Sequence, residues 1–326
     1  MSGHGASEKM RVSGMAEYTR REWLQLTGTA ILAASGSLAG GGTVSLQAIE
    51  PIQRVGKPHF RLSLAGYSLR DHFSGKRQPA ISLEDYVDLA AQWGFDAVEP
   101  TAYYFKDTSV TFLARLKGRC TRLGLDVSGG AVGNNFCVAD PAALKKQIAD
   151  VKAWIERYSV LGGKTIRIFA GSVPKGDTEE NARRRCIEAI QECCDHAARY
   201  GIYLALENHG GITSTPQQML AIVREVKHDY FGVNLDTGNF HGEDPYQELA
   251  QIAPYAVVCQ VKTEITRTRN GKRQPPEPAD LQKILGILRG VGYRGYISLE
   301  YEAAEEPMKA IPRYAEELRR LIAEKV

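Results

Sequence analysis

Apolar residues follow two different spacings along most of the chain. From about residue 60, short apolar runs typical of buried β-strands alternate with longer segments in which apolar residues recur every three or four positions, as in amphipathic helices. Each apolar run is followed by one helical segment, so the chain repeats a strand-then-helix unit. The predicted strands are residues 60–65, 96–99, 125–128, 165–169, 203–207, 231–236, 257–261 and 296–300.

Helix start signals fall between these strands. The segments Ser82–Asp85 and Asp177–Glu180 have the pattern of capping boxes, and Thr215 is followed by a proline at the first helical position. Eight strand-then-helix units with short connections predict an α/β fold, a single (β/α)8 TIM barrel. A doubly wound parallel sheet is the second choice, but it does not explain the count of eight, and no Gly-x-Gly-x-x-Gly motif follows the first strand.

The N-terminal segment has a different character. Residues 19–24 contain paired arginines, residues 24–39 are weakly apolar and uncharged, and three glycines follow. This order resembles a twin-arginine export signal. The alternative is an amphipathic helix with adjacent arginines, but the signal is favoured because the apolar run is too short and its residues are too small to span a bilayer. We therefore expect residues 1–55 to be signal and linker, residues 56–326 to form the barrel, and the mature protein to be periplasmic or otherwise extracytoplasmic, without a stable membrane span.

Composition and charge exclude several classes of protein. The 326 residues are 43% hydrophobic, which is enough to bury a large core. The net charge of +3 is too small and too evenly spread for a nucleic-acid-binding surface. The six cysteines form no regular disulfide framework and no Cys-x-x-Cys pair. The expected partner is therefore a small molecule rather than a nucleic acid, and a homo-oligomer is compatible with the composition.

Acidic and amide residues end the last four predicted strands. Glu207, Asp236, Gln260 and Glu300 each lie at or near the end of an apolar run. In a TIM barrel the carboxyl ends of the strands form the active face, and alternation along each strand puts these four side chains on the inner side. We expect them at comparable depth around one rim. Three carboxylates in one confined mouth repel one another unless something neutralises them.

Two kinds of neutralisation are open. One is a divalent cation, because carboxylate and amide oxygens suit Mn²⁺, Mg²⁺ or Co²⁺, and also bind Zn²⁺. The other is ordinary pairing of each acid with an arginine or lysine. The same placement on four strands favours one divalent metal ion held by Glu207, Asp236, Gln260 and Glu300. Arg167, inside the fourth predicted strand, is expected to be a structural ion-pair partner.

Four short motifs give the chain a family resemblance. They are "LALENHGG" (204–211), "GVNLDTGNF" (232–240), "YISLEYE" (296–302) and, more weakly, "GFDAVEP" (94–100). In these motifs the sequence resembles the xylose isomerase-like TIM-barrel superfamily of sugar isomerases and epimerases, from Phe60 to about Leu321.

The resemblance implies roles for the strand-end residues. In epimerases of this superfamily, Glu, Asp, His and Glu from the last four strands hold a metal, and the two glutamates exchange protons with the substrate. The glutamates match Glu207 and Glu300, and the aspartate matches Asp236. The histidine position is Gln260, whose neutral amide donates less than imidazole and should weaken or re-tune the metal site.

The implied activity is a metal-dependent isomerisation or epimerisation through an enediolate. Export argues for a non-phosphorylated sugar or keto sugar as the substrate. Lys262 is expected to stabilise the enediolate oxygen, and the loop 267–273 is interpreted as solvated rather than as a clamp for an anionic substrate. The residues expected to bind substrate hydroxyls are Tyr67, Glu99, His209, Asn239, His241 and Glu302.

Three other functions are weighed against this one. A lyase or hydrolase of 3-keto-glycosides would use the same enolate chemistry, and sequence does not separate it from an isomerase. A non-catalytic carbohydrate-binding barrel would make Gln260 the mark of a lost metal site. A DNA-repair nuclease on the same barrel is disfavoured, because it needs a histidine-rich zinc cluster and the chain has seven histidines, few of them near the rim.

Overall fold

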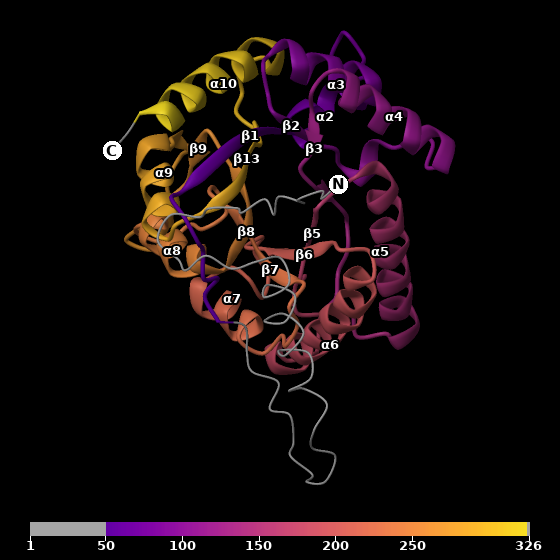
Figure 1. The fold of residues 1–326 in the computed structure, drawn as a ribbon. Helices are drawn as coiled ribbons and strands as arrows, with labels where there is room; N and C mark the ends of the chain where they lie inside the picture. Colours follow the sequence, from indigo (N-terminus) through magenta and orange to yellow (C-terminus); the bar gives the residue numbers. More distant parts are fainter. Residues whose placement is uncertain (1–49, 325–326) are drawn as a thin grey trace, which may run out of the picture. The chain divides into compact units, whose positions relative to one another are not determined.

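Parallel strands form the centre of the computed structural model, which describes residues 50–324, and helices surround them (Figure 1). The strand order around the sheet is β3-β2-β1-β13-β8-β7-β6-β5-β4, and every neighbouring pair is parallel. The predicted α/β fold, a single TIM barrel, is confirmed. Residues 1–49 of the expected signal and linker segment lie outside the part of the chain that the structure describes.

The barrel strands match the predicted runs with one difference. They are β1 (His59–Ala65), β2 (Ala97–Glu99), β3 (Asp126–Val127), β4 (Gly130–Ala131), β5 (Thr165–Ile168), β6 (Tyr203–Glu207), β7 (Phe231–Asp236), β8 (Ala256–Val261) and β13 (Arg294–Leu299). The third predicted strand, residues 125–128, contains β3, which pairs with β2, and an additional short strand that the sequence did not predict, β4, follows it and pairs with β5. The break between β3 and β4 falls at Gly129, where a Cβ atom would lie 2.6 Å from the carbonyl oxygen of Thr165.

Helices connect successive strands. The longer ones are α3 (Leu83–Gln92), α4 (Val110–Arg122), α5 (Pro141–Leu161), α6 (Glu179–Ala198), α7 (Pro216–Val223), α8 (Pro245–Ile252), α9 (Leu281–Gly290) and α10 (Pro307–Ala323). The short ones are η1 (Gly66–Leu69), α2 (Arg70–Phe73), η2 (Ala102–Tyr104) and η3 (Ala253–Tyr255). Within residues 50–324, no helix combines the length and apolar character needed to cross a membrane.

The segment after β8 adds two small antiparallel pairs to the barrel. Strand β9 (Glu264–Ile265) pairs with β12 (Glu277–Pro278), and β10 (Thr268–Arg269) pairs with β11 (Lys272–Arg273). The β10–β11 hairpin turns at Asn270 and Gly271, whose φ angles of 52° and 71° are the left-handed values that such a turn requires. The segment predicted as a solvated loop therefore contains an ordered hairpin.

Two of the three predicted helix starts are confirmed. Ser82 forms a capping box with Asp85, and Thr215 caps α7 with a proline at the next position. The predicted capping box at Asp177 is wrong by one residue. Thr178 is the N-cap of α6 and accepts from the backbone of Asn181, while the Asp177 carboxylate pairs with Arg185 instead.

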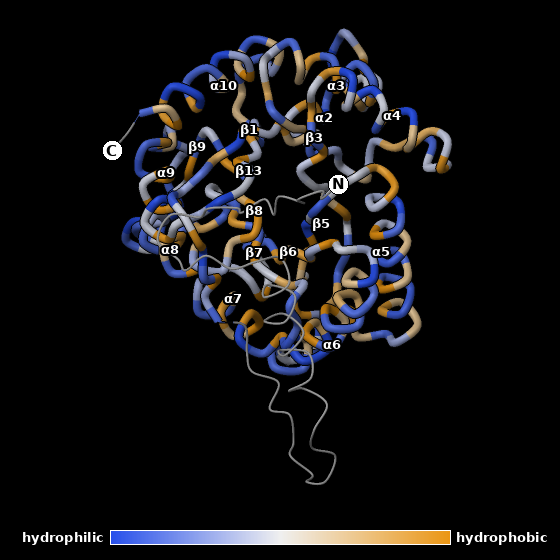
Figure 2. The backbone as a smooth tube through the Cα atoms, in the orientation of Figure 1, coloured by the Kyte–Doolittle hydropathy of each residue, from blue (hydrophilic) through white to orange (hydrophobic). Residues whose placement is uncertain are grey.

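The core lies between the sheet and the inner sides of the helices. Hydrophilic and hydrophobic residues alternate along helices such as α5 and α10, as their amphipathic sequences require (Figure 2). Several buried tyrosines reach backbone carbonyl oxygens, as when Tyr158 donates to Pro100 at 2.7 Å and Tyr293 donates to Tyr296 at 2.8 Å. Tyr158 belongs to α5, and its ring lies so close to β4 that a Cβ atom at Gly130 would lie 2.0 Å from it.

We expect Gly130→Ala to destabilise the fold, because the added methyl group has no room beside a buried ring that is held by its own hydrogen bond. Overpacking of this kind costs about 1–3 kcal/mol in the free energy of unfolding. Urea unfolding followed by circular dichroism measures the change.

Gly286→Ala in α9 is the matched control. Apart from its own helix, no described atom lies within 4 Å of a Cβ at Gly286, so alanine should stabilise the helix by about 0.5–1 kcal/mol. Equal stability of the two variants would contradict the close approach of α5 to β4.

Candidate active site

Acidic side chains from separate strands meet at the carboxyl-terminal rim of the barrel. Glu207 ends β6, Asp236 ends β7, and Glu300 directly follows β13. All three are buried, with exposed fractions of 3%, 0% and 6%. Gln260 lies in β8, opposite Asp236 in the sheet register. The predicted strand-end residues therefore lie on neighbouring strands, at the end of the barrel where TIM-barrel enzymes carry out their chemistry.

Lys262 supplies positive charge to this rim. Its Nζ atom lies 3.3 Å from Asp236 Oδ2 and 2.5 Å from Glu300 Oε2, and it also donates to Glu302 Oε2. Burial acts to lower the pKa of Lys262, but Asp236, Glu300 and Glu302 outweigh burial and raise it well above its usual range. The ammonium group therefore remains charged between three carboxylates.

Arg167 holds the remaining acid of the rim. Its Nε atom lies 2.9 Å from Glu207 Oε2, and both side chains are less than a tenth exposed. Arg167 Nη1 also donates to the carbonyl oxygen of Val132 at 2.7 Å. Asn239 Nδ2 donates to Glu207 Oε1 at 2.9 Å, so both carboxylate oxygens of Glu207 are fixed. Arg167 is thus the ion-pair partner that its position in the fourth strand predicted.

Gln260 lies between two buried polar side chains. Its Nε2 atom donates to Glu99 Oε1 at 2.6 Å, and its Oε1 atom accepts from Asn234 Nδ2 at 2.6 Å. Burial and the nearby Glu300 raise the pKa of Glu99 to about 7. Asn234 is a site residue that the sequence analysis missed. The sequence could have revealed it, because Asn234 lies two residues before Asp236 in β7 and side chains two apart in a strand share one face.

The carboxylates of the rim differ in how readily they ionise. Burial raises the pKa of Glu207 more than the Arg167 contact lowers it. Burial also raises the pKa of Asp236 well above its usual range, despite the attraction of Lys262. Burial acts on Glu300 in the same direction, but Lys262 and Arg167 outweigh it and lower the pKa of that carboxyl. Neighbouring acids in one site thus hold their protons with different strength.

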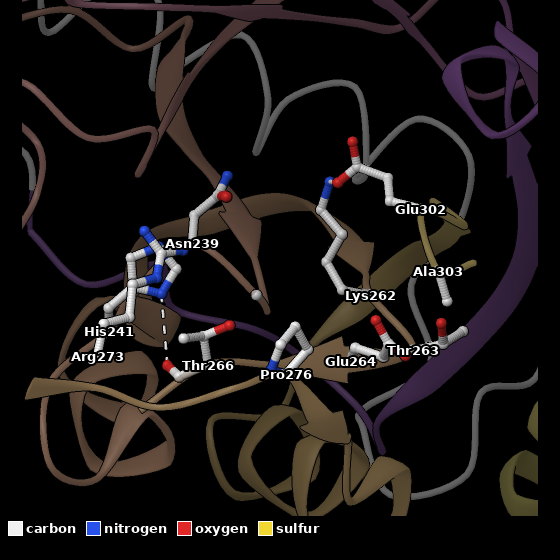
Figure 3. A pocket seen from close by; sticks show the side chains of 11 residues that line it. Asn239, His241, Lys262, Thr263, Glu264, Thr266, Arg273, Pro276, Glu302 and Ala303 are labelled. Atoms are coloured by element: carbon white, nitrogen blue, oxygen red, sulfur yellow. Dashed lines mark hydrogen bonds and ion pairs between the residues drawn. The ribbon is translucent and has the colours of Figure 1, made fainter. Parts of the chain in front are cut away.

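A pocket of about 200 Å³ opens beside Lys262. Lys262 and Glu302 face each other on one side of it, and Asn239, His241 and Arg273 lie on the other (Figure 3). His241 Nδ1 lies 3.4 Å from the carbonyl oxygen of Thr266, and Arg273 Nη2 lies 3.1 Å from His241 Nε2. Burial and Arg273 lower the pKa of His241, which matches a neutral ring that donates through Nδ1 and accepts through Nε2.

The other expected substrate-binding residues lie around this pocket rather than in it. Tyr67 is half-buried in η1, with the Arg70 guanidinium carbon 5.1 Å from the centre of its ring. His209 is exposed after β6, and its ring centre lies 4.2 Å from that of Phe169. The described lining of the pocket contains Asn239, His241 and Glu302 but neither Tyr67 nor His209.

The rim has the donor chemistry of a divalent metal site, although its groups are engaged with one another. Within residues 50–324, no cluster of three His, Cys, Asp or Glu side chains is arranged to hold an ion. Asp236 Oδ2 is nevertheless buried, and among the described residues none donates a hydrogen bond to it. Carboxylate and amide oxygens are ligands that Mg²⁺ and Mn²⁺ prefer, so the residues fit such an ion chemically.

Fold and rim together define a TIM-barrel enzyme with an acidic active site, and comparison with known proteins gives the family. The sequence profile of the Xylose isomerase-like TIM barrel family matches residues 87–324, so the chain belongs to that family. A relative from Xenopus laevis, named "Putative hydroxypyruvate isomerase", is 24% identical over 242 residues, which cover 69% of this chain and 86% of the relative.

Solved structures share the barrel. The structure of L-ribulose 3-epimerase aligns with a TM-score of 0.65 and 19% identity, and covers 80% of this chain and 94% of its own. A Xylose isomerase-like TIM barrel protein from Mycobacterium smegmatis, crystallised in complex with magnesium, aligns with a TM-score of 0.62 and 19% identity, over 80% and 96% of the two chains. At these identities the likeness shows the fold.

We expect Arg167→Met to cost about 3–5 kcal/mol in the free energy of unfolding, because Glu207 would remain as a buried charge without its partner. Adding Glu207→Gln should recover part of this loss, since the double variant buries no unpaired carboxylate. Urea unfolding of the two single variants and the double variant measures the coupling.

Arg61→Met is the control for this cycle. Arg61 pairs with Asp126 at 2.8 Å, but both side chains are about two-fifths exposed, so its loss should change stability by at most about 1 kcal/mol. A cost for Arg167→Met as small as that of Arg61→Met would rule out a buried charge pair at the rim.

Proposed function

We propose that the chain is a metal-dependent enzyme that isomerises or epimerises a sugar through an enediolate. The observation that carries the proposal is the pair of buried glutamates at the rim, Glu207 and Glu300, each of which has a partner of opposite charge. The family and its isomerase and epimerase relatives support an enzyme of the sugar isomerase/epimerase type.

The two glutamates exchange the proton. One carboxylate removes the proton from the carbon that carries a hydroxyl beside the carbonyl group, and the electron pair moves onto the carbonyl oxygen to give an enediolate. The other glutamate returns a proton. Return to the same carbon from the opposite face gives the epimer, whereas return to the neighbouring carbon exchanges aldose and ketose. The Lys262 ammonium lines the pocket and stabilises negative charge on the enediolate oxygen.

The residues that would hold the metal are Glu207, Asp236, Glu300 and Gln260, the last through its amide oxygen. A divalent ion bound there supplies Lewis acidity that makes the carbon next to the carbonyl more acidic. The oxygen ligands favour Mn²⁺, Mg²⁺ or Co²⁺, and Zn²⁺ is also accepted by such a set. The magnesium complex of the Mycobacterium smegmatis neighbour supports this part of the proposal.

The pocket suits a small carbohydrate. Asn239, His241 and Glu302 line it and offer donors and acceptors for several hydroxyl groups. The paired arginines before a weakly apolar run in residues 19–39 support export by the twin-arginine route. An extracytoplasmic enzyme meets free sugars and keto sugars rather than phosphorylated ones, so we take a non-phosphorylated sugar as the substrate.

We expect Glu207→Gln and Glu300→Gln each to lower turnover by at least about 100-fold, because a neutral amide cannot accept the substrate proton. The measurement is deuterium incorporation from D₂O into a panel of ketoses and keto sugars, followed by NMR.

Glu305→Gln is the control, since Glu305 pairs with Arg313 on the surface and should leave exchange unchanged. Exchange at the unaltered rate in Glu207→Gln or Glu300→Gln would remove that residue from the proton-transfer role.

Metal content tests the other half of the proposal. Protein purified without chelator should contain roughly one divalent ion per chain by plasma mass spectrometry, and Asp236→Ala should lose it, because one of three anionic ligands is gone. Absence of metal from the unaltered protein, even after reconstitution with Mn²⁺, would refute metal dependence.

A further inference from the structure

Lys262 contacts the same oxygen atoms that a metal ion at the rim needs. Its ammonium nitrogen lies 3.3 Å from Asp236 Oδ2 and 2.5 Å from Glu300 Oε2. Asp236 and Glu300 are two of the three carboxylates in the proposed metal site. The lysine thus already neutralises part of the negative charge from which the sequence analysis predicted a cation.

An ion and the ammonium group cannot share these two oxygens. An ion bound to Asp236 Oδ2 and Glu300 Oε2 would lie within a few ångströms of Lys262 Nζ, because Nζ itself contacts both atoms. Positive charges that close repel strongly in a site where the lysine side chain is only 10% exposed. Binding of the ion therefore requires Lys262 to leave.

The structure provides a place for Lys262 to go. Glu302, its third partner, is 38% exposed and lines the pocket together with Lys262 (Figure 3). A lysine has a flexible four-carbon stem, so Nζ can turn toward the pocket and keep the Glu302 contact while it releases Asp236 and Glu300. Gly238 leaves room for the stem, since a Cβ atom there would lie 2.6 Å from Lys262 Cγ.

The other two proposed ligands, Gln260 and Glu207, add little to the affinity of the ion when it competes with Lys262. Gln260 offers a neutral amide oxygen that already accepts from Asn234, and Glu207 is held by Arg167 and Asn239. An ion must therefore displace protein donors at several positions before it is fully coordinated.

We infer that the Lys262 ammonium and a divalent cation are alternative occupants of one carboxylate cluster, and that Lys262 releases Asp236 and Glu300 and keeps only Glu302 when the ion binds. The inference rests on the proposed metal dependence and adds a specific role for Lys262. In the metal-bound enzyme Lys262 faces the pocket, where it contacts the substrate, and in the metal-free enzyme it prevents repulsion among the acids. The lysine thereby sets the apparent affinity for the metal.

The first test is calorimetric titration of the metal-free protein with MnCl₂. Lys262→Met keeps the length of the side chain but removes its charge, so it should tighten Mn²⁺ binding by about tenfold or more. Lys152→Met is the matched control, because Lys152 pairs with Glu192 at 2.7 Å between α5 and α6 and should leave the affinity unchanged.

The second test uses the unaltered protein and so does not depend on how the variant folds. Reductive methylation with formaldehyde, read by peptide mass spectrometry, should modify Lys262 slowly without metal and several-fold faster with saturating Mn²⁺. The reactivity of Lys152 should be the same in both samples.

The outcomes separate the two proposals. Equal Mn²⁺ affinity in the unaltered protein and Lys262→Met, with unchanged labelling, would overturn the competition and leave metal dependence standing. Binding only in Lys262→Met would support the competition and remove the metal from the natural enzyme. No binding in either protein would overturn both.

Discussion

Glu207, Asp236 and Glu300 carry like charges that the barrel buries within reach of one another, and the rest of the rim is arranged around their repulsion. Arg167 and Lys262 reduce this repulsion by forming ion pairs with Glu207 and Glu300. Burial raises the pKa values of all three acids, and Lys262 and Arg167 reverse that shift only at Glu300, so Glu207 and Asp236 hold protons more readily than Glu300 does. The ion pair of Arg167, the position of Lys262 and the proposed metal site thus all answer the repulsion among these three acids.

Much of the fold follows from local pattern. Strands β6 and β7 begin and end where the sequence predicts, because each is an apolar run that stops at an acidic residue facing the mouth. The separate short strand β4 could not be predicted in this way. It results from the approach of Thr165 and Tyr158 to Gly129 and Gly130, a tertiary contact that leaves no periodic signal in the sequence.

The site shows the same division. Alternation along each strand places Glu207, Asp236 and Glu300 on the inner side, so their meeting is predictable without coordinates. Their partners are not. The amide of Gln260 joins residues from β7 and β2, and its bond to Glu99 spans 161 positions in the chain. Which acid a lysine or arginine neutralises depends on side-chain torsions, and sequence spacing carries no information about those.

The insert after β8 has a consequence for how this barrel acquires new specificity. Its base is closed by the pairing of β9 with β12 and by the bond from the Ala279 backbone to the carbonyl oxygen of Thr263 at 2.9 Å. The β10–β11 hairpin places Arg273 in the lining of the pocket, whereas Glu207 ends β6 and Glu300 directly follows β13. The length and sequence of the hairpin can therefore vary, and change the shape and charge of the pocket, without disturbing the strand ends that carry the buried acids.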